Sequence, residues 1–219
     1  MENFCGKLLA TFNCLSGAAF NTTLMLQIGA AISDEVRAFA NGGGIRHYDN
    51  RSIAPTVWVP SINLAVNPLW GRNVEVYGED PWHAGLLAAS MVQGVQHGLE
   101  AGPYAYLKVS AAAKHFTGYL TENNRFGFNL QLDDHDVVVT HLVPWEVLMT
   151  TGGGAAGVMC AYPAINGVPM CGNADLEWTV LRGQYGVGYG NGCVRIRAAR
   201  AHSHSLARTR LPAHSHSLP

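Results

Sequence analysis

The sequence predicts an α/β fold in which helices cover a parallel sheet, and it favours a (β/α)8 barrel over a doubly wound sheet. Strand and helix patterns alternate along the chain, which is the order that a parallel sheet requires. Gly42-Gly43-Gly44 continues as Ile-Arg-His and so gives no G-x-G-x-x-G after a strand, and the other phosphate-binding motif of nucleotide folds, G-x-x-x-x-G-K-[ST], occurs nowhere. Polar residues cluster directly after predicted strands, where the site of a barrel lies.

The chain begins with a helix pattern followed by a β-rich stretch. Apolar residues recur at helical spacing over residues 24–39, with Asn21 as the expected N-cap and Gly42 beyond the end. Residues 56–59 and 62–66 are rich in Val, Ile and Trp, which indicates extended chain.

A second helix is predicted from Asp80, which precedes a proline, to Gly98. An acidic N-cap with proline in the first turn is a typical helix start. The remaining expected elements are a strand at 106–111, a helix at 134–149 interrupted near Pro144, a strand at 156–160 and a helix at 174–181.

Composition predicts a globular chain with one main domain of residues 1–190. Of the 219 residues 48% are hydrophobic and only 13% charged, which excludes a disordered chain. The formal net charge of −1 gives no reason to expect nucleic acid or an anionic membrane as partner. Residues 147–174 carry no charge, but glycines and prolines interrupt them, so a turn-rich segment is expected rather than a membrane span.

Residues 191–219 differ from the rest of the chain. They contain five arginines and no acid, and residues 201–207 nearly repeat as 213–219. We expect this segment to be a disordered tail, with no stable contacts for residues 193–219. The alternatives are a tail that binds a metal or an anion, and a segment translated out of frame or across an intron.

The five cysteines form an odd set without a Cys-x-x-Cys pair, so no zinc ribbon is indicated. Cys160 and Cys171 are close enough in sequence for a disulfide, but two free, partly buried thiols are the favoured interpretation. The start of the chain shows no secretory signal pattern, and the compartment stays unknown.

Several motifs occur together in one order. The longest is Asn67-Pro-Leu-Trp-Gly-Arg-Asn-Val-Glu-Val-Tyr-Gly-Glu-Asp-Pro81, and Ala113-Lys-His-Phe116, Val158-Met-Cys-Ala-Tyr162 and Asn166-Gly-Val-Pro169 follow it. These motifs resemble those of glycoside hydrolase family 3, which contains β-glucosidases and β-xylosidases. The resemblance covers roughly residues 18–189 and implies the incomplete N-terminal TIM-type barrel domain of that family.

The resemblance implies hydrolysis of β-linked xylose or glucose from non-reducing ends, as in xylan breakdown, without a cofactor. Glu35-Val-Arg-Ala38 and Leu181-Arg-Gly-Gln184 are more similar to the β-xylosidase branch of plants and fungi. The expected partner is therefore a β-linked oligosaccharide or glycoside. Relatives in the family are often secreted or attached to the cell wall.

Three residues are expected to bind the sugar. Arg72 and Lys114 bring positive charge and several donors, and His115 offers one donor and one acceptor, so the three can hold adjacent hydroxyls. We expect them in one pocket at the carboxyl ends of the strands. The resemblance adds Met159 and Tyr162 as further substrate contacts.

The acidic residues nearby are expected to have structural roles. Glu75 and Asp80 orient Arg72 or cap a helix in this interpretation. Asp133, Asp134 and Asp136 suggest a metal site, but acids that open a helix are stabilised by its dipole, and no metal is predicted.

The catalytic carboxyls of the family are not found. The nucleophilic Asp should follow a G-Y-V-x-S-D strand, but Cys193 stands near its expected position and no Asp or Glu occurs after Glu177. The acid/base of the family usually lies in a following domain. A retaining glycosidase needs both carboxyls, so we expect no appreciable turnover from this polypeptide. The alternatives are a non-catalytic sugar-binding remnant and a protein that interacts through its tail.

Overall fold

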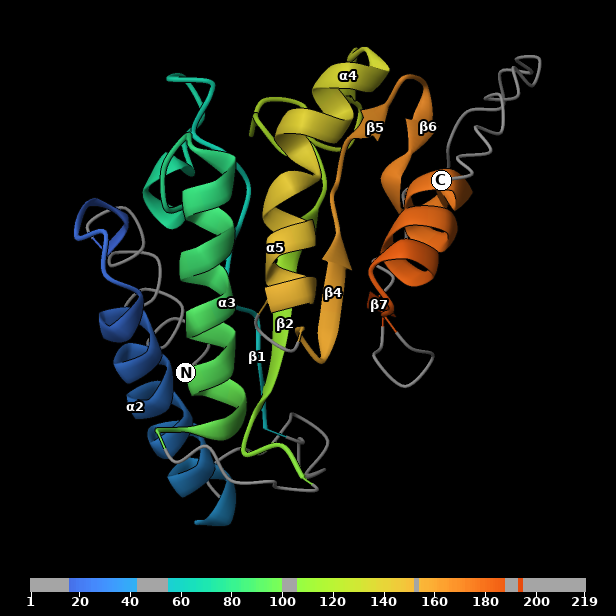
Figure 1. The fold of residues 1–219 in the computed structure, drawn as a ribbon. Helices are drawn as coiled ribbons and strands as arrows, with labels where there is room; N and C mark the ends of the chain where they lie inside the picture. The colour runs from blue at the N-terminus through green and yellow to red at the C-terminus, as the bar shows by residue number, and fades with distance from the viewer. Residues whose placement is uncertain (1–15, 43–54, 100–105, 152–153, 188–192, 195–219) are drawn as a thin grey trace, which may run out of the picture.

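The main sheet contains four parallel strands. The computed structural model describes residues 16–42, 55–99, 106–151, 154–187 and 193–194 (Figure 1). In spatial order the strands are β1 (Thr56–Val57), β2 (Ser110–Phe116), β4 (Gly157–Cys160) and β7 (Cys193–Val194).

Three helices lie on one face of this sheet, and the predicted α/β class with a parallel sheet is confirmed (Figure 1). They are α2 (Thr22–Asn41), α3 (Pro81–His97) and α5 (Val143–Thr151).

Short elements complete the described fold, and several of them lie beyond the carboxyl end of β4 (Figure 1). A small sheet pairs β3 with β5 in parallel and β5 with β6 in antiparallel orientation. The short elements are β3 (Asn129–Leu130), β5 (Ala164–Ile165), β6 (Val168–Pro169), α4 (Asp134–Asp136), the 3-10 helices η1 (Asn73–Glu75) and η3 (Met170–Gly172), and the π-helical turns η2 (Val137–His141) and η4 (Asp175–Gln184).

The two long helices begin and end where their capping residues predict. The Asn21 side chain accepts a hydrogen bond from the backbone N–H of Leu24, at 2.9 Å, and Gly42 is the C-cap of α2. Asp80 accepts from the N–H of His83 at 2.8 Å, and Gly98 ends α3 with a φ of 80°. These ends were predictable because capping depends on a few neighbouring residues.

Glycines let α2 and α3 pack with their backbones in contact. A Cβ atom on Gly94 would lie 2.2 Å from the carbonyl oxygen of Leu26, and one on Gly29 would lie 2.4 Å from that of Met91. No side chain fits at either position. The crossing therefore requires glycine on both helices.

The strand predicted at 106–111 is misplaced, because β2 begins at Ser110 and runs to Phe116. Tyr106 is 87% exposed, whereas Ala111, Ala112 and Ala113 are buried. Alanine has a low strand propensity, which hid the strand. Its small side chain fits a sheet that is buried on both faces.

Residues 62–66 were predicted as extended chain and form no strand. Ser61 bridges to Lys114 in parallel, and the N–H of Ile62 donates to the Lys114 carbonyl at 2.8 Å. Ile62 and Leu64 are each 1% exposed, so the apolar residues of this segment are explained by their burial against β2 and not by pairing as a strand.

Cys160 and Cys171 form a disulfide, so the expected free thiols are wrong for this pair. The β5–β6 hairpin reverses the chain between them, with Asn166 and Gly167 both at positive φ. The reversal brings the two Cα atoms to 5.3 Å, within the usual range for a bridge. Sequence spacing alone does not show this reversal.

Removing this disulfide is expected to destabilise the chain. It joins residues 11 apart, and closing a loop of that order restricts the unfolded chain by about 2–3 kcal/mol. The double variant C160A/C171A, compared with the oxidised chain in urea unfolding, should lose about that free energy. A single C5A variant is the control. An unchanged midpoint in the double variant would contradict the expectation.

The expected tail begins within the sheet. The backbone of Cys193–Val194 pairs with Val158 and Met159 of β4, so the expectation of no stable contacts from residue 193 onward is wrong for these two residues. Residues 188–192 and 195–219 lie outside the described residues, and the expected boundary at 190 falls among them.

Candidate functional site

Arg72, Lys114 and His115 come together at the carboxyl end of β2. Lys114 and His115 lie on β2, and Arg72 immediately precedes η1. Nη1 of Arg72 is 3.4 Å from Nε2 of His115, and Nζ of Lys114 is 3.9 Å from Oε2 of Glu75, which also binds Arg72. The strand end and the loop therefore place Arg72 and Lys114 beside the Glu75 carboxylate, and His115 beside Arg72.

Glu75 holds the guanidinium of Arg72 by two hydrogen bonds. Nε donates to Oε1 at 2.8 Å and Nη2 donates to Oε2 at 2.5 Å. Burial by itself lowers the pKa of Arg72, but the hydrogen bond and charge of Glu75 outweigh it, and the net shift is upward. Such paired bonds fix the plane of the guanidinium. Glu75 thus orients Arg72, and Asp80 caps α3.

Lys114 keeps donors available. Its distance from Glu75 is too long for a hydrogen bond, and within the described part of the chain Nζ donates to no other group. Burial lowers the pKa of Lys114 and the charge of Arg72 lowers it further, while Glu75 opposes both. The side chain offers N–H donors beside the fixed Arg72.

His115 is neutral and enclosed by aromatic rings. It is 1% exposed, and its ring centroid lies 4.8 Å from that of Tyr119 and 5.5 Å from that of Tyr162. Burial lowers the pKa of His115 well below its usual value, and the charges of Arg72, Lys114 and Arg125 lower it further.

Met159 and Tyr162 lie beside these residues. Met159 is the register partner of Lys114 across β2 and β4, and it is 7% exposed. Tyr162 follows the end of β4, and its ring contacts those of His115, Tyr119 and Phe126. Their role in binding substrate stays a prediction.

Three further residues join this cluster and were missed in the sequence. The hydroxyl of Tyr119 donates to Oε1 of Glu122 at 2.6 Å, and Nη1 of Arg125 donates to Oε2 at 3.1 Å. Nε of Arg72 lies 3.7 Å from Oε1 of Glu122, and the guanidinium of Arg125 lies 4.6 Å from the Tyr162 ring centroid. The available signal was their position in the loop after β2, at the edge where a barrel site forms.

The cluster combines three cations with two carboxylates. Glu75 and Glu122 both contact Arg72, and Glu122 also binds Arg125. These carboxylates hold the cations in place. What remains for a ligand is a set of N–H donors beside aromatic rings, which suits hydroxyl groups with apolar C–H faces.

Cys193 lies in β7, and its backbone pairs with Val158 of β4, next to Met159. A residue near the position where the resemblance expects the nucleophile therefore lies in the sheet, beside the strand that precedes Tyr162.

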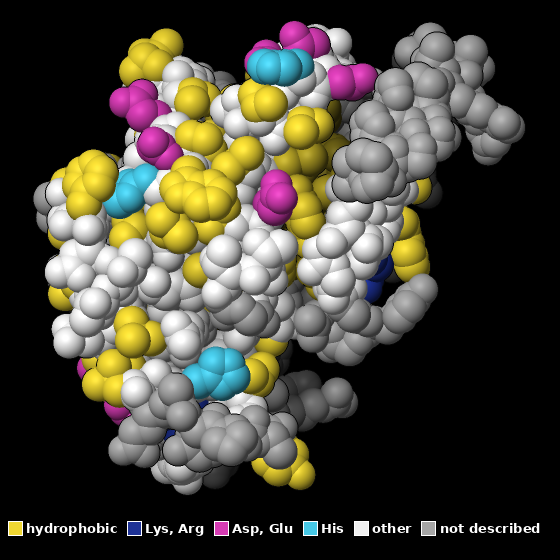
Figure 2. Space-filling view, in the orientation of Figure 1, with side chains coloured by type: hydrophobic (Ala, Val, Ile, Leu, Met, Phe, Trp, Pro, Cys, Tyr) yellow, Lys and Arg dark blue, Asp and Glu magenta, His cyan; other side chains and the backbone are white. Residues whose placement is uncertain are grey.

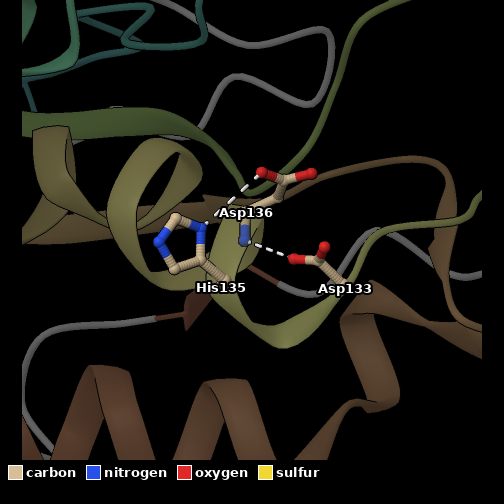
Figure 3. Close-up of side chains that lie close together, drawn as sticks. All are labelled: Asp133, His135 and Asp136. Carbon is tan, nitrogen blue, oxygen red and sulfur yellow. Dashed lines mark hydrogen bonds and ion pairs between the residues drawn. The ribbon is translucent and has the colours of Figure 1, made fainter.

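A separate group of possible metal ligands shares no residue with this cluster. Asp133, His135 and Asp136 place their ligand atoms within 4.8 Å of one another, and all three are exposed (Figure 3). Oδ1 of Asp133 accepts from the N–H of Asp136 at 2.7 Å and caps α4, as expected for acids that open a helix. The capping geometry accounts for the position of Asp133 without an ion.

A cavity of about 540 Å³ lies near the start of β2 and the C-terminal end of α3, not at the cluster. Its only charged contact among its own lining residues is the ion pair of Lys108 with Asp34. The amide of Gln96, also at its wall, binds Gly154 and Ala156 and is therefore occupied by the protein.

The helix-covered face carries few cations. Figure 2 shows scattered hydrophobic side chains there, with acidic groups and hardly any Lys or Arg. Among the described residues, no helix combines the length and apolar character needed to cross a membrane.

The fold and the cluster together define an α/β domain with a polar site at the carboxyl ends of parallel strands. Residues 15–194 match the sequence model of the glycosyl hydrolase family 3 N-terminal domain. The chain belongs to this family, as the motifs predicted.

Curated relatives include Beta-D-xylosidase 1 from Arabidopsis thaliana, which is 39% identical over 174 residues, with 78% of this chain and 21% of that protein aligned. A probable exo-1,4-β-xylosidase from Aspergillus terreus is 36% identical over 182 residues, covering 79% and 22%. The chain thus spans about a fifth of the length of these relatives.

Solved structures of similar proteins superpose on this chain. A family 3 exo-β-xylosidase in complex with a xylobiose aziridine probe superposes with a TM-score of 0.68 at 31% identity, covering 81% of this chain and 21% of that one. β-Glucosidase 3B from Thermotoga neapolitana has a TM-score of 0.67 at 28% identity, covering 80% and 21%.

Proposed function

We propose that this chain forms the sugar-binding part of a β-glycosidase site, built on a section of a (β/α)8 barrel. The observation that carries the proposal is the convergence of Arg72, Lys114 and His115 at the carboxyl end of β2, inside the region that matches the family. Parallel strands with helices on one face suit a barrel section, whose sites form at that end.

The chemistry of the cluster suits a neutral sugar. Arg72 is held by Glu75, so its geometry is set before a ligand binds, and Lys114 adds donors that no other described residue uses. Pre-set donors bind with a smaller loss of conformational freedom. Met159 and Tyr162 supply apolar and aromatic surface next to them.

We assign β-linked xylose as the preferred sugar, with β-linked glucose second. The relatives described above are named as β-xylosidases, and the 31% identical structure is an exo-β-xylosidase. The xylosidase-like sequence elements at residues 35–38 and 181–184 support the same order.

Catalysis needs two carboxyls that are free to react. In the described cluster, Glu75 and Glu122 are tied to arginines, and the sequence has no Asp or Glu after Glu177. These facts favour the second candidate function, a non-catalytic sugar-binding remnant, as the behaviour of the 219-residue polypeptide itself.

The purified polypeptide is expected to bind xylose weakly and to release no p-nitrophenol from p-nitrophenyl β-xyloside. Loss of a positioned acid or base typically lowers the rate by on the order of 10²–10⁴-fold. Binding is measured by ligand-observed NMR, and turnover is measured in parallel on the β-xyloside and the β-glucoside.

Lys114→Ala should abolish the NMR signal of binding, and Lys108→Ala, which lies just before β2 and outside the cluster, is the matched control. Binding that survives Lys114→Ala would overturn the proposed site. Turnover by the wild-type chain would contradict the expected lack of catalysis, and its loss in Lys114→Ala would locate that activity at this cluster.

A further inference from the structure

Asn63 is buried behind the site and makes three hydrogen bonds to one residue, His115. It is 4% exposed and follows Ile62, whose N–H binds the carbonyl of Lys114. The segment that carries Asn63 therefore lies alongside the end of β2.

The bonds fix the orientation of the Asn63 amide. Nδ2 donates to the His115 carbonyl at 2.9 Å, and Oδ1 accepts from the His115 N–H at 3.0 Å. A carbonyl only accepts and a backbone N–H only donates, so the opposite amide orientation would lose both bonds.

The same oxygen then determines the tautomer of the ring. Oδ1 of Asn63 lies 3.1 Å from Nδ1 of His115. An amide oxygen has lone pairs and no proton, so a hydrogen bond here requires the proton on Nδ1. In a neutral imidazole the other nitrogen, Nε2, then carries none.

The surroundings of the ring favour the neutral form. Burial lowers the pKa of His115, and the Arg72, Lys114 and Arg125 cations oppose an added positive charge. The described carboxylates of the cluster, Glu75 and Glu122, bind these cations and are not hydrogen-bonded to the imidazole.

We propose that Asn63 is a positioning residue that holds His115 as the Nδ1-protonated tautomer, so that Nε2 can only accept a hydrogen bond: from Arg72 in the structure, and from a donating sugar hydroxyl that takes the place of Arg72 when a sugar binds. In this tautomer Nη1 of Arg72, 3.4 Å from Nε2, is the donor of the hydrogen bond that Nε2 accepts, which agrees with an unprotonated Nε2. The identity of the ligand in this proposal rests on the proposed function, whereas the tautomer of His115 does not depend on it.

The tautomer gives His115 a defined role in specificity. A hydroxyl that meets Nε2 must supply the proton, and Arg72 or Lys114 can then donate to the oxygen of that hydroxyl. A deoxyfluoro sugar keeps a weak acceptor but has no proton to give. When fluorine replaces the hydroxyl that meets Nε2, the sugar should bind as poorly as the corresponding deoxy sugar. If Nε2 carried a proton instead, it could donate to the fluorine, and the deoxyfluoro sugar would keep part of its affinity.

The first test is ¹⁵N NMR of the imidazole rings in the 219-residue chain, with the His115 signals assigned by their loss in His115→Gln. A protonated Nδ1 coupled to its proton and an unprotonated Nε2 are expected. A protonated Nε2 in the wild-type chain would overturn the proposal. This measurement needs neither a folded Asn63 variant nor a ligand.

The second test compares variants of Asn63. Asn63→Ala removes the acceptor, and a shift of the proton toward Nε2 is expected together with about a tenfold loss of xylose affinity. Asn63→Asp keeps an acceptor opposite Nδ1 but loses the Nδ2 donor to the His115 carbonyl, so Nδ1 should stay protonated although that second bond is lost. Asn129→Ala, which removes a comparable amide-to-backbone bond in the β3–β5 region, should leave the His115 signals unchanged.

The outcomes separate the two proposals. The expected tautomer without any sugar binding would reject the proposed function and leave the role of Asn63 standing. Sugar binding with a proton on Nε2 would reject the role of Asn63 and leave the proposed function standing. An Asn63→Ala variant that folds and keeps the Nδ1 tautomer would show that another group fixes the ring.

Discussion

Replacing Arg72 by alanine is expected to abolish measurable sugar binding and to destabilise the fold. The Arg72 guanidinium bridges Glu75 and Glu122 and approaches His115, and its side chain is only 17% exposed. Its loss leaves two partly buried carboxylates without their shared cation, and breaking a buried pair from one side costs about 3 kcal/mol. Isothermal urea unfolding and ligand-observed NMR with xylose measure the two effects.

Arg72→Lys is the informative control for this prediction. Lysine retains the charge but lacks the planar fork that binds Glu75 by two bonds. We expect it to recover part of the stability and little of the sugar binding. Full xylose binding by Arg72→Lys would show that the cluster needs only a positive charge here, which would contradict the positioning role assigned to Glu75.

Placing a methyl group on Gly94 is expected to destabilise the chain by about 3 kcal/mol. The added Cβ would lie 2.2 Å from the carbonyl oxygen of Leu26 and 2.8 Å from the backbone nitrogen of Ala30. Both atoms belong to the backbone of α2, so the overlap is relieved only when the helices separate and lose buried contacts. Overpacking of this kind typically costs 1–3 kcal/mol or more.

Gly172→Ala is the matched control for Gly94→Ala. A Cβ on Gly172 meets no atom within 4 Å, and its φ is not in the left-handed region. Its effect on the unfolding midpoint should be small. Equal effects of the two substitutions would show that α2 and α3 separate easily, and that their crossing adds little to stability.

Both expectations follow because helix packing and the polar cluster depend on different parts of the chain. The helices α2 and α3 pack closely on one face of the sheet, and the carboxyl ends of the strands carry the polar cluster. The cations in that cluster are held by carboxylates from the loops after residues 66 and 116. Changing a cation therefore affects stability and binding together, whereas changing the helix crossing affects binding only through the fold.

The sequence by itself determined the features that depend on neighbouring residues. Asn21 and Asp80 cap their helices because capping is decided within one turn, and the alternating pattern predicted the parallel sheet. The motif order identified the family and singled out Arg72, Lys114 and His115, which the structure brings together.

Only the tertiary structure decided the features that join distant segments. The alanine-rich strand β2 is defined by its burial between neighbours, and Cys160 reaches Cys171 because the β5–β6 hairpin reverses the chain. The hydrogen bonds that His115 makes join it to Asn63, which is 52 residues away in sequence. Hydrogen bonds and close packing act over a few ångströms in space, so the residues that satisfy them are known only once the fold has brought them together.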